Sequence, residues 1–154
     1  MSGFANLDPA LAINPDVDRV RRFLALDASE PVVFVNLHRY WERAQYPDDY
    51  AGPDPHVSGS EAYHRYVNEV EHRFLPQVGA RFLIVAPVDL TLIGAGDWHD
   101  AVIASYPSRK AALELPALQG YADIAVHRQA GLEAVLTVAL GAAALDRLRD
   151  ARSR

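Results

Sequence analysis

Hydrophobic and polar residues follow one another in a pattern that predicts four strands and two long helices. Four segments are rich in β-branched and aromatic residues, as strands are: residues 32–41, 81–93, 101–106 and 132–140. Residues 59–78 place apolar side chains at helical intervals. Residues 108–128 form a second helical segment, which Pro116 and Gly120 interrupt. The predicted order is therefore strand, helix, strand, strand, helix, strand.

The helix over residues 59–78 has the clearest signals. Ser58 and Glu61 have the spacing of a capping box, in which each side chain satisfies a free backbone N–H group of the first turn. Tyr63 and Tyr66 belong to its apolar face, so we expect them to pack in the core. The opposite face carries polar residues: Glu61, His64, Arg65, Asn68, Glu69 and His72.

Turn residues divide these elements. Gly79 and Gly131 are natural helix ends, and Ser108 is a natural N-cap. Residues 94–97, which begin Gly-Ala-Gly, predict the turn of a hairpin between the second and third strands.

Short helices are expected at both ends of the chain. Asn14 predicts an N-cap, Pro15 suits the first helical position, and this helix should end near Asp27. Residues 142–150 predict a tail helix. The expected organisation has three parts: an N-terminal extension (1–30), a folded domain (31–140) and a helical tail (141–154).

This order of elements predicts an α+β, ferredoxin-like βαββαβ fold with a four-stranded antiparallel sheet. Right-handed crossovers place the first and third strands in the centre. Pro87 cannot donate to a strand ladder, which fits an edge position for the second strand. Two helices cover only one face of such a sheet, yet the strands carry apolar residues on both faces. A second copy of the chain is expected to cover the other face, which makes the protein a homodimer.

Composition narrows the class of protein. The chain has 154 residues, 50% hydrophobic and 23% charged, which suits one folded domain and excludes disorder as the main state. A formal net charge of −5 argues against a nucleic-acid partner. The chain has no cysteine, so disulfides, thiolate catalysis and cysteine-based zinc sites are excluded.

Location and metal content can also be predicted. The N-terminus lacks the pattern of a signal peptide, and the longest apolar stretch, residues 132–145, is too short to span a bilayer. A soluble, cytoplasmic protein with no membrane partner is expected. The six histidines show no ligand spacing, since His64 and His72 are eight residues apart, so neither a metal nor a cofactor is expected.

Five short motifs follow one another between residues 31 and 140. They comprise Pro31–Val33 with Asn36, Leu37, Arg39, Ala44, Tyr46 and Pro47; Ser58, Gly59, Glu61–Tyr63 and Tyr66; Val78, Gly79 and Arg81; Tyr106–Arg109; and His127, Arg128 and Ala130–Glu133. Their order and spacing resemble the domain-of-unknown-function 1330 family. The chain departs from this family at Ala80, where a second glycine is usual, and over residues 113–121.

The resemblance implies the dimeric α/β-barrel superfamily, in which two ferredoxin-like subunits pack sheet against sheet and each keeps a cavity. Better-known relatives are cofactor-free oxygenases and isomerases, polyketide cyclases and some haem proteins. The family itself has no settled activity, so the resemblance implies a fold and dimerisation more than a function.

Three residues are candidates for acid–base catalysis. Asn36 and His38 are two apart on the first strand and therefore share a face. A neutral imidazole can accept a proton near pH 7, and an amide can hydrogen-bond a developing oxyanion. His127, at the end of the second crossover, is the third candidate. In the alternative interpretation, Asn36 hydrogen-bonds a loop and His38 lies at the dimer seam or in solvent.

Two arginines are candidate anchors for an anionic ligand. Arg128 can clamp a carboxylate, or it can offset the dipole at the end of its helix and fix the crossover. Arg39 ends an otherwise apolar strand face, where it can bind an anion or pair with Asp48 or Asp49.

A long loop over residues 42–58 follows the first strand and is predicted to be a lid or binding loop. Tyr40, Trp41, Tyr46 and Tyr50 lie at its start, where they can line the pocket of an aromatic ligand or pin the loop to the domain. Two functions stay open. One is a cofactor-independent oxygenase, isomerase or cyclase acting on a small aromatic or enolic molecule, and the other is a non-catalytic dimer that binds a metabolite or has a structural role.

Overall fold

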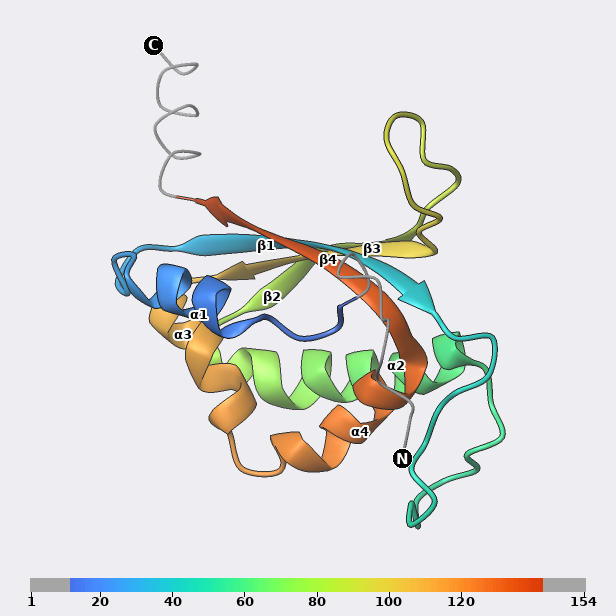
Figure 1. The fold of residues 1–154 in the computed structure, drawn as a ribbon. Coiled ribbons are helices and arrows are strands. Elements are labelled where there is room, and N and C mark those ends of the chain that lie inside the picture. Colours follow the sequence, from blue (N-terminus) through green and yellow to red (C-terminus); the bar gives the residue numbers. More distant parts are fainter. Residues whose placement is uncertain (1–11, 143–154) are drawn as a thin grey trace.

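A four-stranded antiparallel sheet with helices against one of its faces makes up the structure, a computed structural model that describes residues 12–142 (Figure 1). The strands are β1 (Val32–Tyr40), β2 (Arg81–Pro87), β3 (Asp100–Tyr106) and β4 (Leu132–Gly141). Their order in the sheet is β2-β3-β1-β4, with β1 and β3 central as predicted. The ferredoxin-like α+β fold is confirmed. Residues 143–150 of the predicted tail helix lie outside the described residues.

Helices fill the connections between these strands. They are α1 (Val17–Leu24), α2 (Gly59–Glu69), α3 (Arg109–Glu114) and α4 (Tyr121–Gly131). The helix predicted over residues 59–78 is α-helical only to Glu69 and then continues as a π-helical turn (Val70–Phe74) and a 3₁₀ turn (Leu75–Val78). The second helical segment is broken as predicted, by a 3₁₀ turn over Leu115–Ala117 between α3 and α4. Figure 1 shows α2 and α4 packed together beneath the sheet.

The capping box predicted for α2 is present. The Ser58 hydroxyl accepts a hydrogen bond from the Glu61 backbone at 3.1 Å, and the Glu61 carboxylate accepts one from the Ser58 backbone at 2.9 Å. Gly79 ends this helical segment with a φ of 68°, a left-handed conformation that glycine adopts without strain. Local signals therefore place α2 at the point where the chain leaves β1.

The predicted start and end of the first helix were wrong. Asp16, rather than Asn14, is the N-cap of α1, because the Asp16 carboxylate accepts the Arg19 N–H group at 2.8 Å. The amide oxygen of Asn14 instead accepts a hydrogen bond from Arg128 at 3.3 Å. The helix ends at Leu24, three residues before the predicted end.

The second strand is shorter than predicted. It ends at Pro87, which lacks an N–H group, and residues 88–99 form a long hairpin loop. Gly94 and Gly96 turn the chain with φ values of 101° and 107°. The tip of this loop is apolar, with Leu92 84% and Ile93 91% exposed. The loop projects from the sheet on the side opposite the helices (Figure 1).

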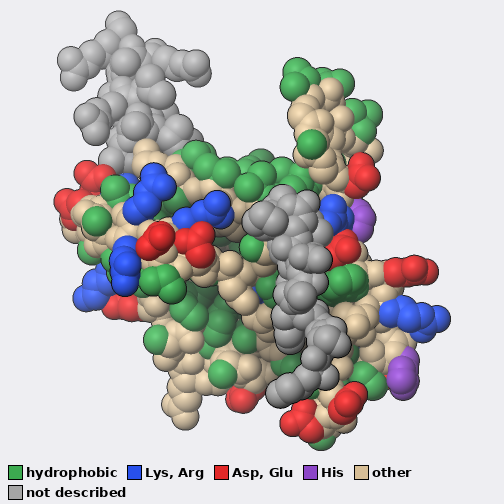
Figure 2. Space-filling model, viewed as in Figure 1, with side chains coloured by type: hydrophobic (Ala, Val, Ile, Leu, Met, Phe, Trp, Pro, Cys, Tyr) green, Lys and Arg blue, Asp and Glu red, His purple; other side chains and the backbone are tan. Residues whose placement is uncertain are grey.

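The two faces of the sheet differ. One face packs on the helices around a core that includes Phe74, Leu75 and Leu132, each 1% exposed. In the part of the chain that the structure describes, no helix covers the other face, which we call the open face. Strand pairing places apolar residues there: Val35, Leu37, Ile84, Ile103, Leu136, Val138 and Leu140. Figure 2 shows hydrophobic side chains gathered along this upper edge of the molecule.

Candidate functional site

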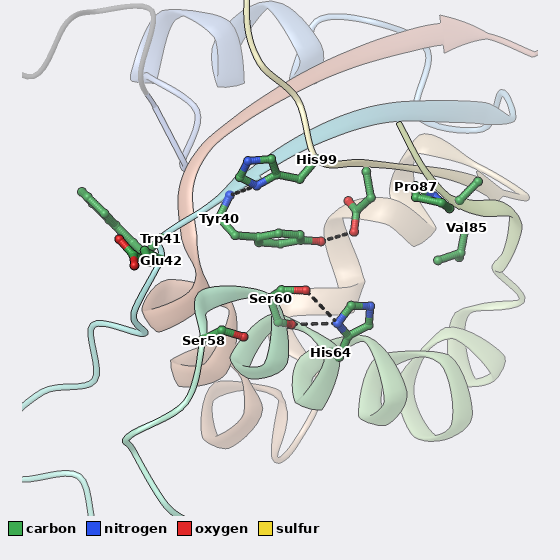
Figure 3. Close-up of a pocket in the computed structure, with 11 residues that line it drawn as sticks. Tyr40, Trp41, Glu42, Ser58, Ser60, His64, Val85, Pro87 and His99 are labelled. Atoms are coloured by element: carbon green, nitrogen blue, oxygen red, sulfur yellow. Dashed lines mark hydrogen bonds between the residues drawn. The ribbon is translucent and has the colours of Figure 1, made fainter. Parts of the chain in front are cut away.

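An open cavity of about 680 Å³ lies at the end of the sheet, where β1, β2 and β3 meet the first turns of α2 (Figure 3). We call it the outer cavity. Its walls are Tyr40, Trp41, Glu42, Ser58, Ser60, His64, Val85, Ala86, Pro87, His99 and Asp100. This volume is within the range of about 300–1,000 Å³ that is usual for small-molecule sites.

Backbone hydrogen bonds from Trp41 to Gly59 and Gly131 fix one wall of the outer cavity. The Gly59 N–H donates to the Trp41 carbonyl, and the Trp41 N–H donates to the Gly131 carbonyl, both at 3.0 Å. A Cβ atom on Gly59 would lie 2.6 Å from the Gly131 oxygen, so the start of α2 and the end of α4 come together only without side chains. This contact positions the first turns of α2, which include Ser60 and His64, beside the end of β1.

Two histidines of the outer cavity have opposite hydrogen-bonding roles. The His64 Nδ1 atom lies 2.8 Å from the Ser60 carbonyl oxygen, which only accepts, so in the neutral ring Nδ1 carries the proton and Nε2 can accept one. The His99 Nδ1 atom accepts the Tyr40 N–H group at 3.0 Å, so its neutral ring carries the proton on Nε2. Their rings lie 6.5 Å and 5.7 Å from the Tyr40 ring, on either side of it in Figure 3. Of these two rings, His64 therefore offers an acceptor nitrogen and His99 an N–H donor.

A buried row of hydrogen bonds runs inward from this cavity. Asp100 accepts from the Tyr40 hydroxyl, and its other carboxylate oxygen lies 2.8 Å from the His38 Nδ1 atom. The His38 Nε2 atom lies 3.1 Å from the Tyr63 hydroxyl. Because a carboxylate only accepts, neutral His38 carries its proton on Nδ1 and accepts the Tyr63 proton at Nε2. Burial raises the pKa values of both the Tyr40 and Tyr63 hydroxyls, so both stay protonated at neutral pH.

A second, smaller cavity of about 100 Å³ lies between the sheet and the helices, and we call it the inner cavity. Asn36 and His38 both line it, which confirms that they share a face. The Asn36 amide already donates to the Val102 carbonyl at 3.0 Å and accepts from the Thr137 hydroxyl at 2.7 Å. The volume suits a few water molecules or one very small molecule, and it is below the range for an aromatic ligand.

His127 lines neither cavity and lies instead against Tyr46 of the 42–58 loop. Its Nδ1 atom is 2.7 Å from the Tyr46 hydroxyl, which also accepts a hydrogen bond from Arg65 at 3.1 Å. The Tyr46 ring stacks on Tyr50 at 4.2 Å. These contacts tie the 42–58 loop to α2 and α4.

The two arginines also lie apart. Arg39 forms an ion pair with Glu133 at 2.7 Å, so the predicted partners Asp48 and Asp49 were wrong. Glu133 starts the strand beside Arg39, whereas the 42–58 loop leads away from it to the helices. Arg128 donates to the Ile13 carbonyl and also lines the inner cavity.

Sequence reasoning assigned no catalytic or binding role to Tyr63, His64, His99 or Asp100, which line these cavities. Tyr63 and His64 were assigned only to the apolar and polar faces of their helix. The strand register that sets Asp100 opposite His38 would have identified this pair.

A pH-dependent contribution to stability is expected from His127. Burial, followed by the charge of Arg65, lowers its pKa from the ordinary value of 6.5. The unfolded chain takes up this proton at a higher pH than the folded chain does. The contribution is therefore complete above pH 6.5 and declines as the pH falls through the lowered pKa. His127→Asn, which keeps an acceptor for Tyr46, should show a shallower loss of unfolding free energy below pH 6.5 in urea titrations.

His72→Asn is the control, because His72 is exposed and lies on the π-helical turn that follows α2, whereas His127 lies on α4. In that variant, the unfolding free energy should fall with pH as steeply as it does in the original protein. Identical slopes for His127→Asn and the unchanged chain would contradict the prediction.

The sheet order and the helices on one face define a ferredoxin-like α+β protein with two cavities joined by a buried polar row. The family model described as Domain of unknown function (DUF1330) matches residues 53–142, more than half of the chain. The protein belongs to this family.

Three solved structures match this chain to different degrees. A crystal structure of RPA0582, a protein of unknown function from Rhodopseudomonas palustris, is 30% identical, with a TM-score of 0.73 over 84% of this chain and 95% of that chain. A methylated form of RPA0582 is 29% identical, with a TM-score of 0.75 over 86% and 95%. A dimeric ferredoxin-like protein of unknown function from Bacteroides fragilis is 10% identical, with a TM-score of 0.42 over 72% and 95%. No curated protein matches the chain.

Two further properties concern residues 12–142 alone. Within them, no helix has the length and apolar character to cross a membrane. The same residues contain no cluster of three or more histidine, aspartate or glutamate side chains that could hold a metal ion.

Proposed function

We propose that the protein is a homodimer that binds a small enolisable molecule in the outer cavity and transfers a proton on it, as an isomerase does. The observation that carries this proposal is the pair of histidines with opposite roles, His64 as proton acceptor and His99 as donor. The apolar wall formed by Trp41, Val85 and Pro87 suits the hydrocarbon part of such a molecule.

Isomerisation is the reaction that these groups support best. Enolisation converts a C=O double bond into a C=C double bond beside it. It requires a base that removes a proton from the neighbouring carbon and a hydrogen-bond donor that stabilises the negative charge on the oxygen. The imidazole of His64 would take the carbon-bound proton, and the N–H group of His99 would bond the enolate oxygen. Return of the proton to a different atom completes the reaction, and no redox partner is needed.

The homodimer is supported by the open face. Leu136, Val138 and Leu140 on β4 are each 42–46% exposed, and Ile84 on β2 is 49% exposed. A contiguous apolar sheet face of this kind is typical of a surface that packs against another protein surface. In a two-fold symmetric dimer, the open face of one copy would cover the open face of the other.

Proton exchange tests the catalytic part of the proposal. Phenylpyruvate and acetylacetone, one aromatic and one aliphatic enolisable compound, are incubated with the protein in D₂O while proton NMR follows the loss of their exchangeable C–H signals. The protein should speed exchange of at least one compound, and His64→Gln should lower that rate by about 100-fold, as removal of a general base does.

His72→Gln is the matched control, because the His72 Nδ1 atom lies 2.8 Å from the Asn68 carbonyl in the same local geometry but outside the cavity. It should leave the rate unchanged. Exchange at the buffer rate with both compounds, or equal rates for the two variants, would overturn the catalytic proposal.

A second candidate function is non-catalytic binding by the dimer. It is favoured by Asn36, whose amide is already bonded to the Val102 carbonyl, and by His38, whose two ring nitrogens both have partners. Chemical-shift changes at outer-cavity residues with either compound, without any acceleration of exchange, would support this function.

A further inference from the structure

We propose that Asp100, His38 and Tyr63 form a second reactive site, in which the Tyr63 hydroxyl attacks a small carbonyl or acyl compound in the inner cavity. Asp100 also lines the outer cavity, but the nucleophile and base of this site differ from His64 and His99, so the site does not depend on the outer-cavity proposal.

The geometry is that of a nucleophile, a base and an orienting carboxylate. The Tyr63 hydroxyl lies 3.1 Å from His38 Nε2, and His38 Nδ1 lies 2.8 Å from the Asp100 carboxylate. Asp100 sets the tautomer of the ring, so Nε2 has its lone pair directed at the Tyr63 proton. His38 is 3% exposed and Tyr63 is 6% exposed, which holds both side chains in this arrangement.

The inner cavity provides a place for the reacting molecule. Tyr63, His38 and Arg128 all line it, and its volume of about 100 Å³ limits the molecule to a few non-hydrogen atoms. A guanidinium group near the cavity stabilises an oxyanion that forms there.

The step is balanced without a further reactant. The Tyr63 oxygen forms a bond to the carbonyl carbon, while the Tyr63 proton moves to His38 Nε2. The electron pair of the carbonyl double bond moves to its oxygen, which becomes an anion beside Arg128. Burial raises the pKa of the Tyr63 hydroxyl, so the phenolate does not form in advance and His38 must take the proton during the attack.

Methanesulfonyl fluoride, a probe with five non-hydrogen atoms, tests this site. Attack by Tyr63 forms an oxygen–sulfur bond, fluoride leaves, and the proton passes to His38. Peptide mapping by mass spectrometry should find the methanesulfonyl group on Tyr63 at least about 10-fold faster than on Tyr66 or Tyr106. These two tyrosines line the same cavity, and within residues 12–142 neither hydroxyl is hydrogen-bonded to a histidine, so they are internal controls.

Asp100→Asn and His38→Gln should each lower the rate at Tyr63 by about 10-fold or more, while His72→Gln, an exposed position outside both cavities, should leave it unchanged. Circular dichroism checks that each variant is folded. If a variant does not fold, the comparison among the three tyrosines of the unchanged protein still decides the question. Modification of Tyr63 no faster than that of Tyr66 or Tyr106 would overturn the proposal, whatever the outcome of the proton-exchange test.

Discussion

Val138→Asp is expected to convert the proposed homodimer into monomers. Val138 lies on the open face in the edge strand β4, paired with Val35 of β1, and is 45% exposed in the single chain. In a dimer packed through this face, the new carboxylate would be buried without a partner. Each copy would bury one such charge at a cost of about 3 kcal/mol, so the two charges of a dimer should weaken association by roughly 10⁴-fold. Sedimentation equilibrium should show a mass near twice 17.0 kDa for the original protein and near 17.0 kDa for the variant.

Val17→Asp is the matched control for this experiment. Val17 is 66% exposed on α1, away from the open face, and undergoes the same chemical change. It should remain a dimer. A monomeric original protein at micromolar concentration, or a Val138→Asp variant that stays dimeric, would show that the open face does not join two copies.

Gly59→Ala is expected to lower the free energy of unfolding by about 3 kcal/mol, at the upper end of the usual range for overpacking. The added Cβ atom would meet the Trp41 carbonyl and lie 2.6 Å from the Gly131 oxygen and 2.7 Å from the Trp41 nitrogen. All three are backbone atoms, so the first turn of α2 must shift against β1 and α4. Urea unfolding followed by circular dichroism measures the change. The same shift would move Ser60 and His64 at the wall of the outer cavity.

Gly141→Ala is the matched control, because it replaces a glycine by alanine without the backbone clash expected at Gly59. Among residues 12–142, a Cβ atom at Gly141 would meet only the flexible Arg109 side chain, at 3.9 Å. We expect an unfolding midpoint within experimental error of the original protein. If Gly59→Ala unfolds at the same urea concentration as Gly141→Ala, the close approach of α2 and α4 is not a determinant of stability.

Much of the fold was predictable because its signals are local. Ser58 and Glu61 start α2 through hydrogen bonds within one helical turn, and Gly79 ends that segment because it adopts a positive φ. Alternation along β1 placed Asn36 and His38 on one face. The errors in the elements have two different causes. Asn14 binds Arg128 of the sequence-distant helix α4 instead of capping α1, and the strand predicted to residue 93 ends locally at Pro87.

The candidate sites were predictable only in part. His38 and Tyr40 were identified from the sequence, but their common partner, Asp100, lies 62 and 60 residues away along the chain. His127 and Asn36 were considered for one site, yet the structure places them apart, because α4 carries His127 to the 42–58 loop rather than to either cavity.

The sequence by itself determined the order of the elements, the position of the strongest helix cap and the presence of two apolar sheet faces, since each depends on neighbouring residues and their periodicity. Only the tertiary structure decided which polar side chains meet. The antiparallel register of β1 and β3 sets Asp100 beside His38, and packing of α2 on the sheet adds Tyr63. The physical reason is that such contacts depend on strand register and helix packing, which many weak interactions across the whole domain determine together.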